Sequence, residues 1–179
     1  MCNNAGVVCE MASMWEQRLE TWRWLIDVKL MGVVHGVRTF APLLIAQGSG
    51  HFLNTASVGG LIGLPNLGPY NATMHAVVGL TETLNAELKA VSEHLGATVL
   101  CPGMVNTPLG QNSAALVPQG AAATPVDGDG DAMSGAISPE LVAEAAIDAV
   151  EAGRVHAVVG PGADVVARGR VEALLADLD

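Results

Sequence analysis

Short apolar runs alternate along this chain with longer stretches of helical character. The first run, Met1 and Cys2, predicts the end of a strand, and later runs predict strands at residues 51–56, 97–101 and 155–159. The longer stretches predict helices at residues 21–47, at 69–95, from 138 onward and at 164–178. Alternation of strand and helix is typical of a parallel sheet with helices on both faces. The sequence therefore predicts the α/β class, with a three-layer, Rossmann-like parallel sheet.

Capping and breaking residues mark several of the predicted helix ends. The Thr21 hydroxyl can cap the first helix, and Gly48 can end it. The run Ser138-Pro139-Glu140 offers a hydroxyl cap, a proline in the first turn and an early carboxylate. Residues 103–137 are rich in Gly, Ala, Pro and Ser and predict a flexible loop, which would cover a substrate.

The composition limits the classes of function. The chain has 179 residues, of which 50% are apolar and 15% charged, and this favours a compact globular protein. A formal net charge of −10 repels a phosphate backbone, so we expect no nucleic-acid partner. The three cysteines have no spacing typical of disulfides or zinc, which favours the cytoplasm, and we expect no cleaved leader.

The most apolar run spans residues 30–46. His35 and Arg38 interrupt it, and the run is short for a membrane span, so we interpret it as a buried helix and expect no membrane partner. The helices at 21–47 and 69–95 carry apolar residues on more than one side. Such helices must be covered on all sides, which predicts a homo-oligomer.

Three separated motifs carry the chemical information. Asn3-Asn4-Ala5-Gly6 follows the first strand, Ser57 precedes Tyr70 by thirteen positions, and Pro102-Gly103 follows a later strand. In this order and spacing they resemble the short-chain dehydrogenase/reductase family, whose active site contains Tyr-x-x-x-Lys. Here the run is Tyr70-Asn71-Ala72-Thr73-Met74, so a methionine occupies the lysine position.

The resemblance implies NAD or NADP as cofactor, a small alcohol or carbonyl as substrate, and a role for each matching residue. Ser57 and Tyr70 match the catalytic serine and tyrosine. The cofactor-binding positions are Asn4, Ala5, Gly6, Tyr70, Pro102, Gly103, Val105 and Thr107. The residue that would choose between NAD and NADP precedes the matched region. The loop that would choose the substrate has no diagnostic residue.

The chemistry explains why a cation matters beside the tyrosine. Hydride transfer to or from a carbonyl carbon needs a proton donor or acceptor at the oxygen, and a free phenol has a pKa of about 10. A fixed cation about 4 Å away is worth roughly 4 kcal/mol at an effective dielectric constant near 20, or about three pKa units. Met74 lies one helical turn after Tyr70 and carries no charge, so we interpret it as ordinary packing.

A second departure from the family lies at Lys29, where the family usually has an asparagine. Its ammonium could replace the missing one. The competing interpretation is a solvated or paired surface group, which is the commoner fate of a lysine. Two of the four catalytic positions are therefore altered, at Lys29 and Met74.

Three further patterns are better explained by structure than by function. The run Gly160-Pro161-Gly162 lacks the third glycine of a dinucleotide fingerprint, so it predicts a turn. Asp127, Asp129 and Asp131 imitate a calcium loop without its glycine and glutamate. The five histidines show no metal-ligand spacing, and we predict no metal site.

Relative to the family, the chain begins after the first strand–helix units and their Gly-rich turn. The sequence therefore predicts a single partial Rossmann-like domain over residues 1–179, corresponding to the carboxy-terminal part of a short-chain NAD(P)-dependent oxidoreductase. We expect impaired alcohol–carbonyl interconversion. The alternative is a non-catalytic fragment or pseudoenzyme that acts only by oligomerising or binding.

Overall fold

The computed structural model describes residues 1–123 and 135–178 and places four strands in one parallel sheet, in the order β1-β2-β3-β4. The strands are β1 (Cys2–Asn3), β2 (Gly50–Thr55), β3 (Leu95–Pro102) and β4 (His156–Val159). In the register, Cys2 lies opposite Leu53, Leu53 opposite Thr98, and Val99 opposite His156. The predicted parallel sheet is confirmed, with each strand within about two residues of its expected position.

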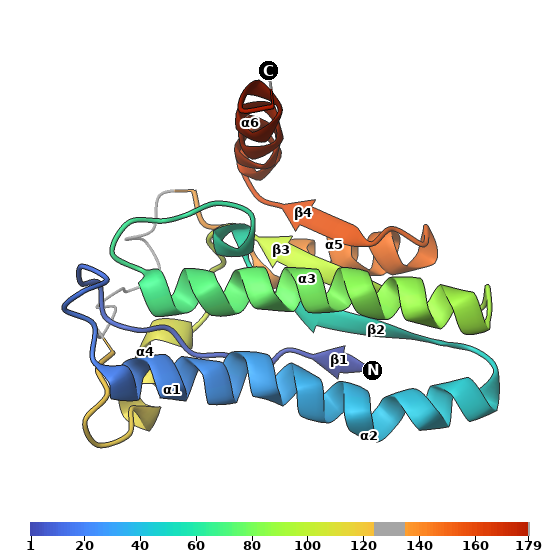
Figure 1. Ribbon diagram of the computed structural model, residues 1–179, viewed down its shortest axis with the longest axis horizontal. Helices are drawn as coiled ribbons and strands as arrows, with labels where there is room; N and C mark the ends of the chain where they lie inside the picture. The colour runs from blue at the N-terminus through green and yellow to red at the C-terminus, as the bar shows by residue number, and fades with distance from the viewer. Residues whose placement is uncertain (124–134, 179) are drawn as a thin grey trace.

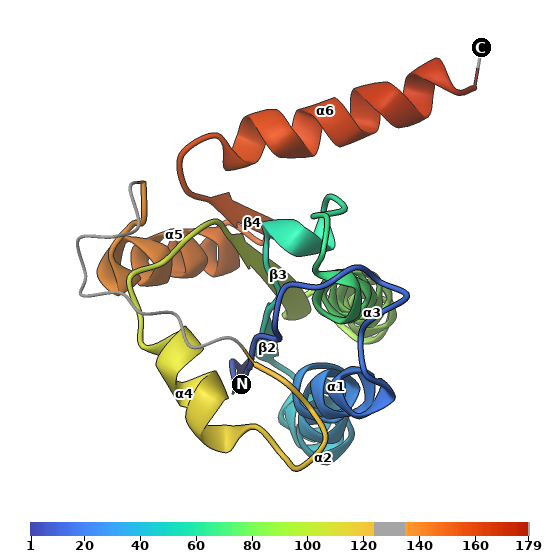
Figure 2. The same ribbon diagram turned by 90° about the vertical axis from the view of Figure 1, so that its left-hand side faces the viewer.

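Helices cover both faces of this sheet, as Figures 1 and 2 show. One face carries α1 (Leu19–Leu25), α2 (Gly32–Gln47) and α3 (Gly68–Val91), and α5 (Pro139–Glu151) lies on the other. The remaining helices are α4 (Leu109–Leu116) and α6 (Ala163–Ala176). The predicted three-layer, Rossmann-like α/β architecture is therefore confirmed.

The first long helix is continuous from Leu19 to Gln47 but changes its winding along the way. A π-helical segment, Ile26–Met31, lies between α1 and α2. Gly48 ends the helix with φ of 81°, as predicted. The predicted cap is wrong, because Thr21 is fully buried inside α1 and its Oγ1 accepts a hydrogen bond from the Ala122 N–H at 3.0 Å.

The exposure of this helix also differs from the prediction. In α2 only Val33 is buried, so the interpretation of residues 30–46 as a buried helix is wrong. The reason is geometric: only one side of α2 packs on the sheet within this chain. By length and composition alone, Leu19–Gln47 could cross a membrane, with a mean hydropathy of 1.4. Helices of globular proteins pass the same test, so this is weak evidence for a membrane span.

Two details of the carboxy-terminal half follow the sequence closely. The Ser138 Oγ accepts a hydrogen bond from the Leu141 N–H at 3.3 Å and caps α5 as predicted. Gly160 and Gly162 have φ of 124° and 70°, which fits the predicted turn.

The segment 103–137 contains helix α4, which its composition did not indicate. The acidic run at Asp127, Asp129 and Asp131 lies outside the described residues. The interpretation of 103–137 as a substrate loop, and of 1–179 as a single partial domain, stays a prediction.

A buried polar network ties the first strands to α3. Asn54 on β2 is fully buried, and its Oδ1 accepts a hydrogen bond from Asn3 Nδ2 at 2.8 Å. Asn54 Nδ2 donates to Thr81 Oγ1 at 3.0 Å, and Thr81 Oγ1 donates to the Val77 carbonyl at 2.7 Å. Without Asn54, the Asn3 amide would lose its acceptor and the Thr81 hydroxyl its donor, so the network specifies how β1, β2 and α3 meet.

We expect Asn54→Ala to lower the free energy of unfolding by about 1–3 kcal/mol, because it removes the fully buried Asn54 amide and leaves the half-buried Asn3 amide without its acceptor. Urea denaturation measures this loss. Asn112→Ala, at an exposed position of α4, is the matched control and should change stability by less than about 0.5 kcal/mol. Equal losses in the two variants would contradict a structural role for the network.

Candidate active site

The predicted motifs meet at the carboxyl edge of the parallel sheet. The run Asn4-Ala5-Gly6 follows β1, Ser57 follows β2, and Gly103 follows β3. The Gly103 N–H donates to the Val159 carbonyl at 2.8 Å, which holds this turn against the end of β4. In open α/β sheets, ligands bind in the crevice outside the carboxyl ends of the strands. Three motifs that are far apart in the sequence thus share one edge.

Ser57 is buried and is fixed by backbone groups on two sides. It caps a short 3-10 turn, Val58–Gly60, and its Oγ accepts a hydrogen bond from the Gly59 N–H at 3.2 Å. The same hydroxyl donates a long hydrogen bond of 3.5 Å to the carbonyl of Pro102. The serine is therefore held between the ends of β2 and β3.

Tyr70 lies in the first turn of α3 and packs against the loop that follows Ser57. A Cβ at Gly59 would lie 3.1 Å from Cε1 of the Tyr70 ring, so a glycine there allows the close approach of ring and loop. Burial raises the pKa of Tyr70, and a hydrogen bond with Ser57 only partly offsets this. The phenol is therefore protonated at neutral pH in the resting protein.

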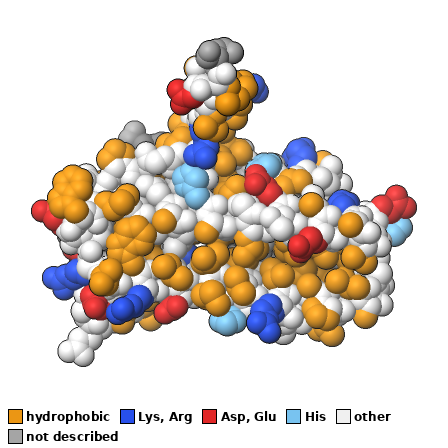
Figure 3. Space-filling view, viewed as in Figure 1, with side chains coloured by type: hydrophobic (Ala, Val, Ile, Leu, Met, Phe, Trp, Pro, Cys, Tyr) orange, Lys and Arg blue, Asp and Glu red, His pale blue; other side chains and the backbone are white. Residues whose placement is uncertain are grey.

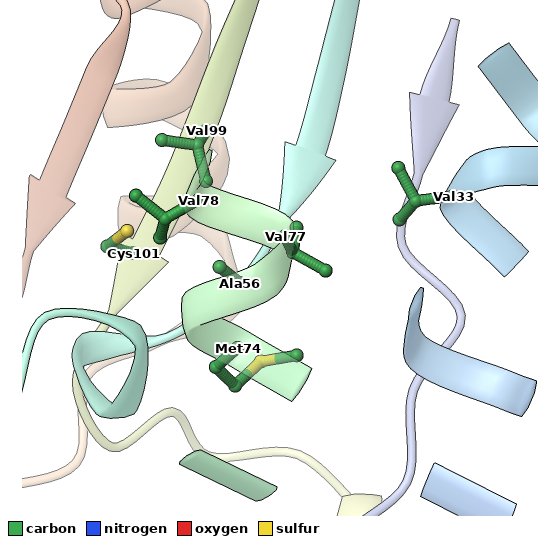
Figure 4. Close-up of a cluster of buried hydrophobic side chains, with 7 residues drawn as sticks. All are labelled: Val33, Ala56, Met74, Val77, Val78, Val99 and Cys101. Atoms are coloured by element: carbon green, nitrogen blue, oxygen red, sulfur yellow. The ribbon is translucent and has the colours of Figure 1, made fainter. Parts of the chain in front are cut away.

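Met74 belongs to the apolar core, as its thioether suggested. It is fully buried in a cluster formed by α3 with residues of α2, β3 and the end of β2 (Figure 4). The buried members are Val33, Ala56, Met74, Val77, Val78, Val99 and Cys101. No charge reaches Tyr70 from this position.

The interpretation of Lys29 as a solvated or paired surface group is wrong. It is neither solvated nor paired: only 6% of it is exposed, and no carboxylate of the described residues lies within ion-pair distance. Its Nζ lies 4.8 Å from the centroid of the Tyr70 ring, a cation–π distance. Burial lowers the pKa of Lys29 to about 8. A Cβ at Gly6 would lie 2.9 Å from this Nζ, so glycine leaves the space that the ammonium occupies.

The remaining predicted cofactor residues differ in their surroundings. Asn4 and Ala5 are exposed and, with Val28 and Gly32, line a cavity of about 150 Å³ beside β1. Val105 packs with Ile137 against the core of the opposite face.

Thr107 is exposed, and the structure shows no side-chain hydrogen bond for it within the described residues. Its predicted contact with a cofactor stays a prediction. In the same described part of the chain, no group of three or more His, Cys, Asp or Glu side chains could hold a metal ion.

Cys9 is a site residue that the sequence did not reveal. It is buried, and the backbone N–H of Tyr70 favours its thiolate and so lowers the pKa of the thiol. Burial raises the pKa of Cys9, and the nearby Lys29 ammonium lowers it. No spacing in the sequence relates Cys9 to Lys29 or Tyr70, because the three come together only when the segment after β1 passes between two helices.

Comparison with known proteins agrees with this geometry. The profile of the short chain dehydrogenase family matches residues 1–116. The chain belongs to this family.

Individual relatives extend the match over nearly the whole chain. The Mycobacterium tuberculosis protein SadH, named as an oxidoreductase, is 34% identical over 177 residues, which cover 93% of this chain and 60% of SadH. Cyclohexanol dehydrogenase of an Acinetobacter species is 39% identical over 107 residues, covering 60% of this chain and 42% of that protein.

Among solved structures, a short-chain dehydrogenase/reductase from Burkholderia phymatum in complex with NAD is similar, with a TM-score of 0.85 and 34% identity. The match covers 98% of this chain and 66% of that one. The chain thus spans about 60% of the length of SadH.

We expect Met74→Lys to destabilise the protein by about 3 kcal/mol or more, because it buries a charge in an apolar cluster near Lys29. In the Lys29→Asn background, the cost of Met74→Lys should fall by about 0.5–3 kcal/mol, because the like charge is gone. Chemical denaturation of the four proteins measures this cycle.

Met74→Leu is the control for packing and should cost less than about 1.5 kcal/mol. Strict additivity of the Lys29→Asn and Met74→Lys effects would show that the two positions do not share one electrostatic environment.

Proposed function

We propose that the chain carries the catalytic part of an NAD(P)-dependent oxidoreductase that interconverts an alcohol and a carbonyl. The observation that supports this is the position of Ser57 and Tyr70 beside Pro102 and Gly103 at the carboxyl edge of the sheet. Two relatives agree with it: one is named a cyclohexanol dehydrogenase, and one is solved in complex with NAD. The proposal covers NAD and NADP alike.

The residues of the chain have distinct roles in this proposal. The Tyr70 phenol donates a proton to the carbonyl oxygen during reduction and accepts one from the alcohol during oxidation. The Ser57 hydroxyl holds that oxygen by a hydrogen bond. The nicotinamide, when bound, supplies or accepts the hydride.

The residues at the sheet edge fit the cofactor. Gly6 and Gly103 place no side chain over the edge, and Asn4 and Ala5 line the cavity beside β1. In our proposal Pro102, Gly103, Val105 and Thr107 hold the nicotinamide end, and Asn4, Ala5 and Gly6 lie toward the adenosine.

A second candidate function is a non-catalytic protein that acts by oligomerising or binding. The apolar Met74 beside Tyr70, and the raised pKa of the Tyr70 phenol, favour this alternative. Activity measurements on active-site variants separate it from the enzyme.

The test of the enzyme uses the chain joined, before Met1, to the region of the Burkholderia phymatum relative that precedes its matched part. In this protein Tyr70→Phe should lower alcohol oxidation with NAD or NADP at least about 100-fold, because the general acid–base group is lost. Asn112→Ala is the surface control and should leave the rate unchanged. A Tyr70→Phe variant as active as its parent would rule out the proposed role.

We also propose that a second copy of the chain covers the outer face of α2 and α3. A groove of about 320 Å³ lies between these helices, and apolar side chains gather along it (Figure 3). Val34, Val37, Leu80 and Leu84 line it. Arg38 and Glu87 lie on the same groove and have opposite charges, which suits a two-fold contact of the surface with itself.

Ile45 lies two turns after Arg38 on the same side of α2 and is 41% exposed. We expect Ile45→Glu to convert an oligomer to a monomer at tens of micromolar, as measured by light scattering, because it places a charge in an apolar contact. Leu141→Glu on α5, exposed on the opposite layer, is the matched control and should keep the parental mass. A parent that is itself monomeric at this concentration would refute the proposed interface.

A further inference from the structure

The chain has two lysines, and they have opposite surroundings. Lys89 is exposed on α3 and donates to the Glu93 carbonyl at 2.8 Å. Lys29 is buried in the π-helical segment with no ion pair to any described carboxylate. A buried ammonium without a counter-charge is costly, so its position needs a compensating interaction.

The groups that face Lys29 come from two other parts of the chain. From α3 the ring of Tyr70 lies 4.8 Å from the Lys29 Nζ, and from the segment after β1 the Cys9 thiol faces it. On its own segment, Asp27 is exposed.

Around this pair lie further groups that can change charge. Cys101 lies near Tyr70. The charge of Glu10 raises the pKa of Cys9, and the charge of Glu82 raises the pKa of Cys101. The nearest partners of the ammonium are therefore weak acids that are neutral at pH 7 and become anions when they lose a proton.

Position 74 offers Tyr70 no charge. Met74, one turn later on α3, is fully buried among apolar side chains. The π-helical segment is continuous with α1 and α2 and brings Lys29 to the ring from the neighbouring helix. Segments of this kind are frequent at functional sites.

We propose that the Lys29 ammonium stabilises the anionic form of Tyr70, in place of a cation at position 74. The catalytic meaning of this interaction rests on the proposed oxidoreductase function. Lys29 acts through Tyr70 and does not touch the reacting atoms, so it is a positioning residue.

The two groups then titrate as a pair. Burial lowers the pKa of Lys29 to about 8 and raises the pKa of Tyr70, so below pH 8 both groups hold their protons. In our proposal the proton that leaves near pH 8 comes partly from the phenol, because the charged ammonium 4.8 Å from the ring centroid favours the phenolate. Part of the population then has a charged ammonium beside a phenolate. Without the ammonium, the buried phenol ionises only above its ordinary pKa of about 10.

The single tyrosine of the chain makes this pair observable without cofactor or substrate. Ultraviolet absorbance of tyrosinate follows the charge of Tyr70 directly. We expect the parent to show a first rise near pH 8, with at least a tenth of the full amplitude, and a second rise above pH 10. Lys29→Met should show only the second rise, and Lys89→Met should behave as the parent.

Two further variants test the charge itself. Lys29→Arg keeps a cation at every pH used, so its tyrosinate midpoint should lie at least one pH unit below that of Lys29→Met. Cys9→Ala should keep the first rise, since the proposal assigns the shared proton to Tyr70. A loss of that rise in Cys9→Ala, or identical curves for the parent and a folded Lys29→Met, would overturn the proposal.

A second measurement covers the case in which Lys29→Met does not fold. Reductive methylation with a carbon-13 label lets NMR follow Lys29 and Lys89 separately. Coupling between two sites is reciprocal, so Lys29 should titrate in two steps in the parent and in one step in Tyr70→Phe. Lys89 should titrate identically in both proteins. One-step titration of Lys29 in both would refute the interaction.

These titrations separate this inference from the proposed function. Their failure would leave the oxidoreductase proposal in place, because they need neither hydride transfer nor a bound cofactor. An inactive joined protein with a two-step Lys29 titration would refute only the oxidoreductase proposal.

Discussion

Strand β3 is the element on which the rest of the structure depends. All eight of its residues are buried, with β2 and β4 paired along its edges and α3 and α5 packed on its faces. A strand covered in this way can satisfy its backbone groups only by hydrogen bonding to both neighbours. The direction of β3 therefore sets the direction of the sheet, and its carboxyl end sets the edge where Ser57, Tyr70 and Gly103 meet.

The site at that edge shows how burial controls charge. The same low dielectric environment raises the pKa of Tyr70 and lowers the pKa of Lys29, so each group is held toward its neutral form. A cation and a phenolate that face each other can offset part of this cost, which neither can do alone. Because the site has a low dielectric constant, the electrostatic interaction between the Lys29 ammonium and the Tyr70 ring is stronger than it would be in water.

The outer face of α2 and α3 follows from the layer arrangement. A helix in a three-layer fold needs apolar residues on the side that meets the sheet, and α2 has further apolar residues on its exposed side. The composition of the sequence indicated that the helix has apolar residues on more than one side. It could not indicate which of these residues are exposed, because the winding changes at the π-helical segment before α2 begins.

The sequence alone determined the element order, the parallel sheet and the family, because these depend on local patterns and on motifs read in order. The end of α2 at Gly48 and the start of α5 at Ser138 could also be predicted, since a cap depends on residues within one turn. Tertiary structure decided the rest. The buried role of Thr21, the helix α4 within residues 103–137, and the contact of Cys9 with Tyr70 all depend on segments distant in sequence.

Lys29 shows the physical reason most directly. Its side chain is as long and polar as that of any surface lysine, and nothing in its neighbouring residues distinguishes it from Lys89. What buries it is the meeting of the Gly6 turn, the π-helical segment and the Tyr70 ring, three parts of the chain that only the folded sheet brings together.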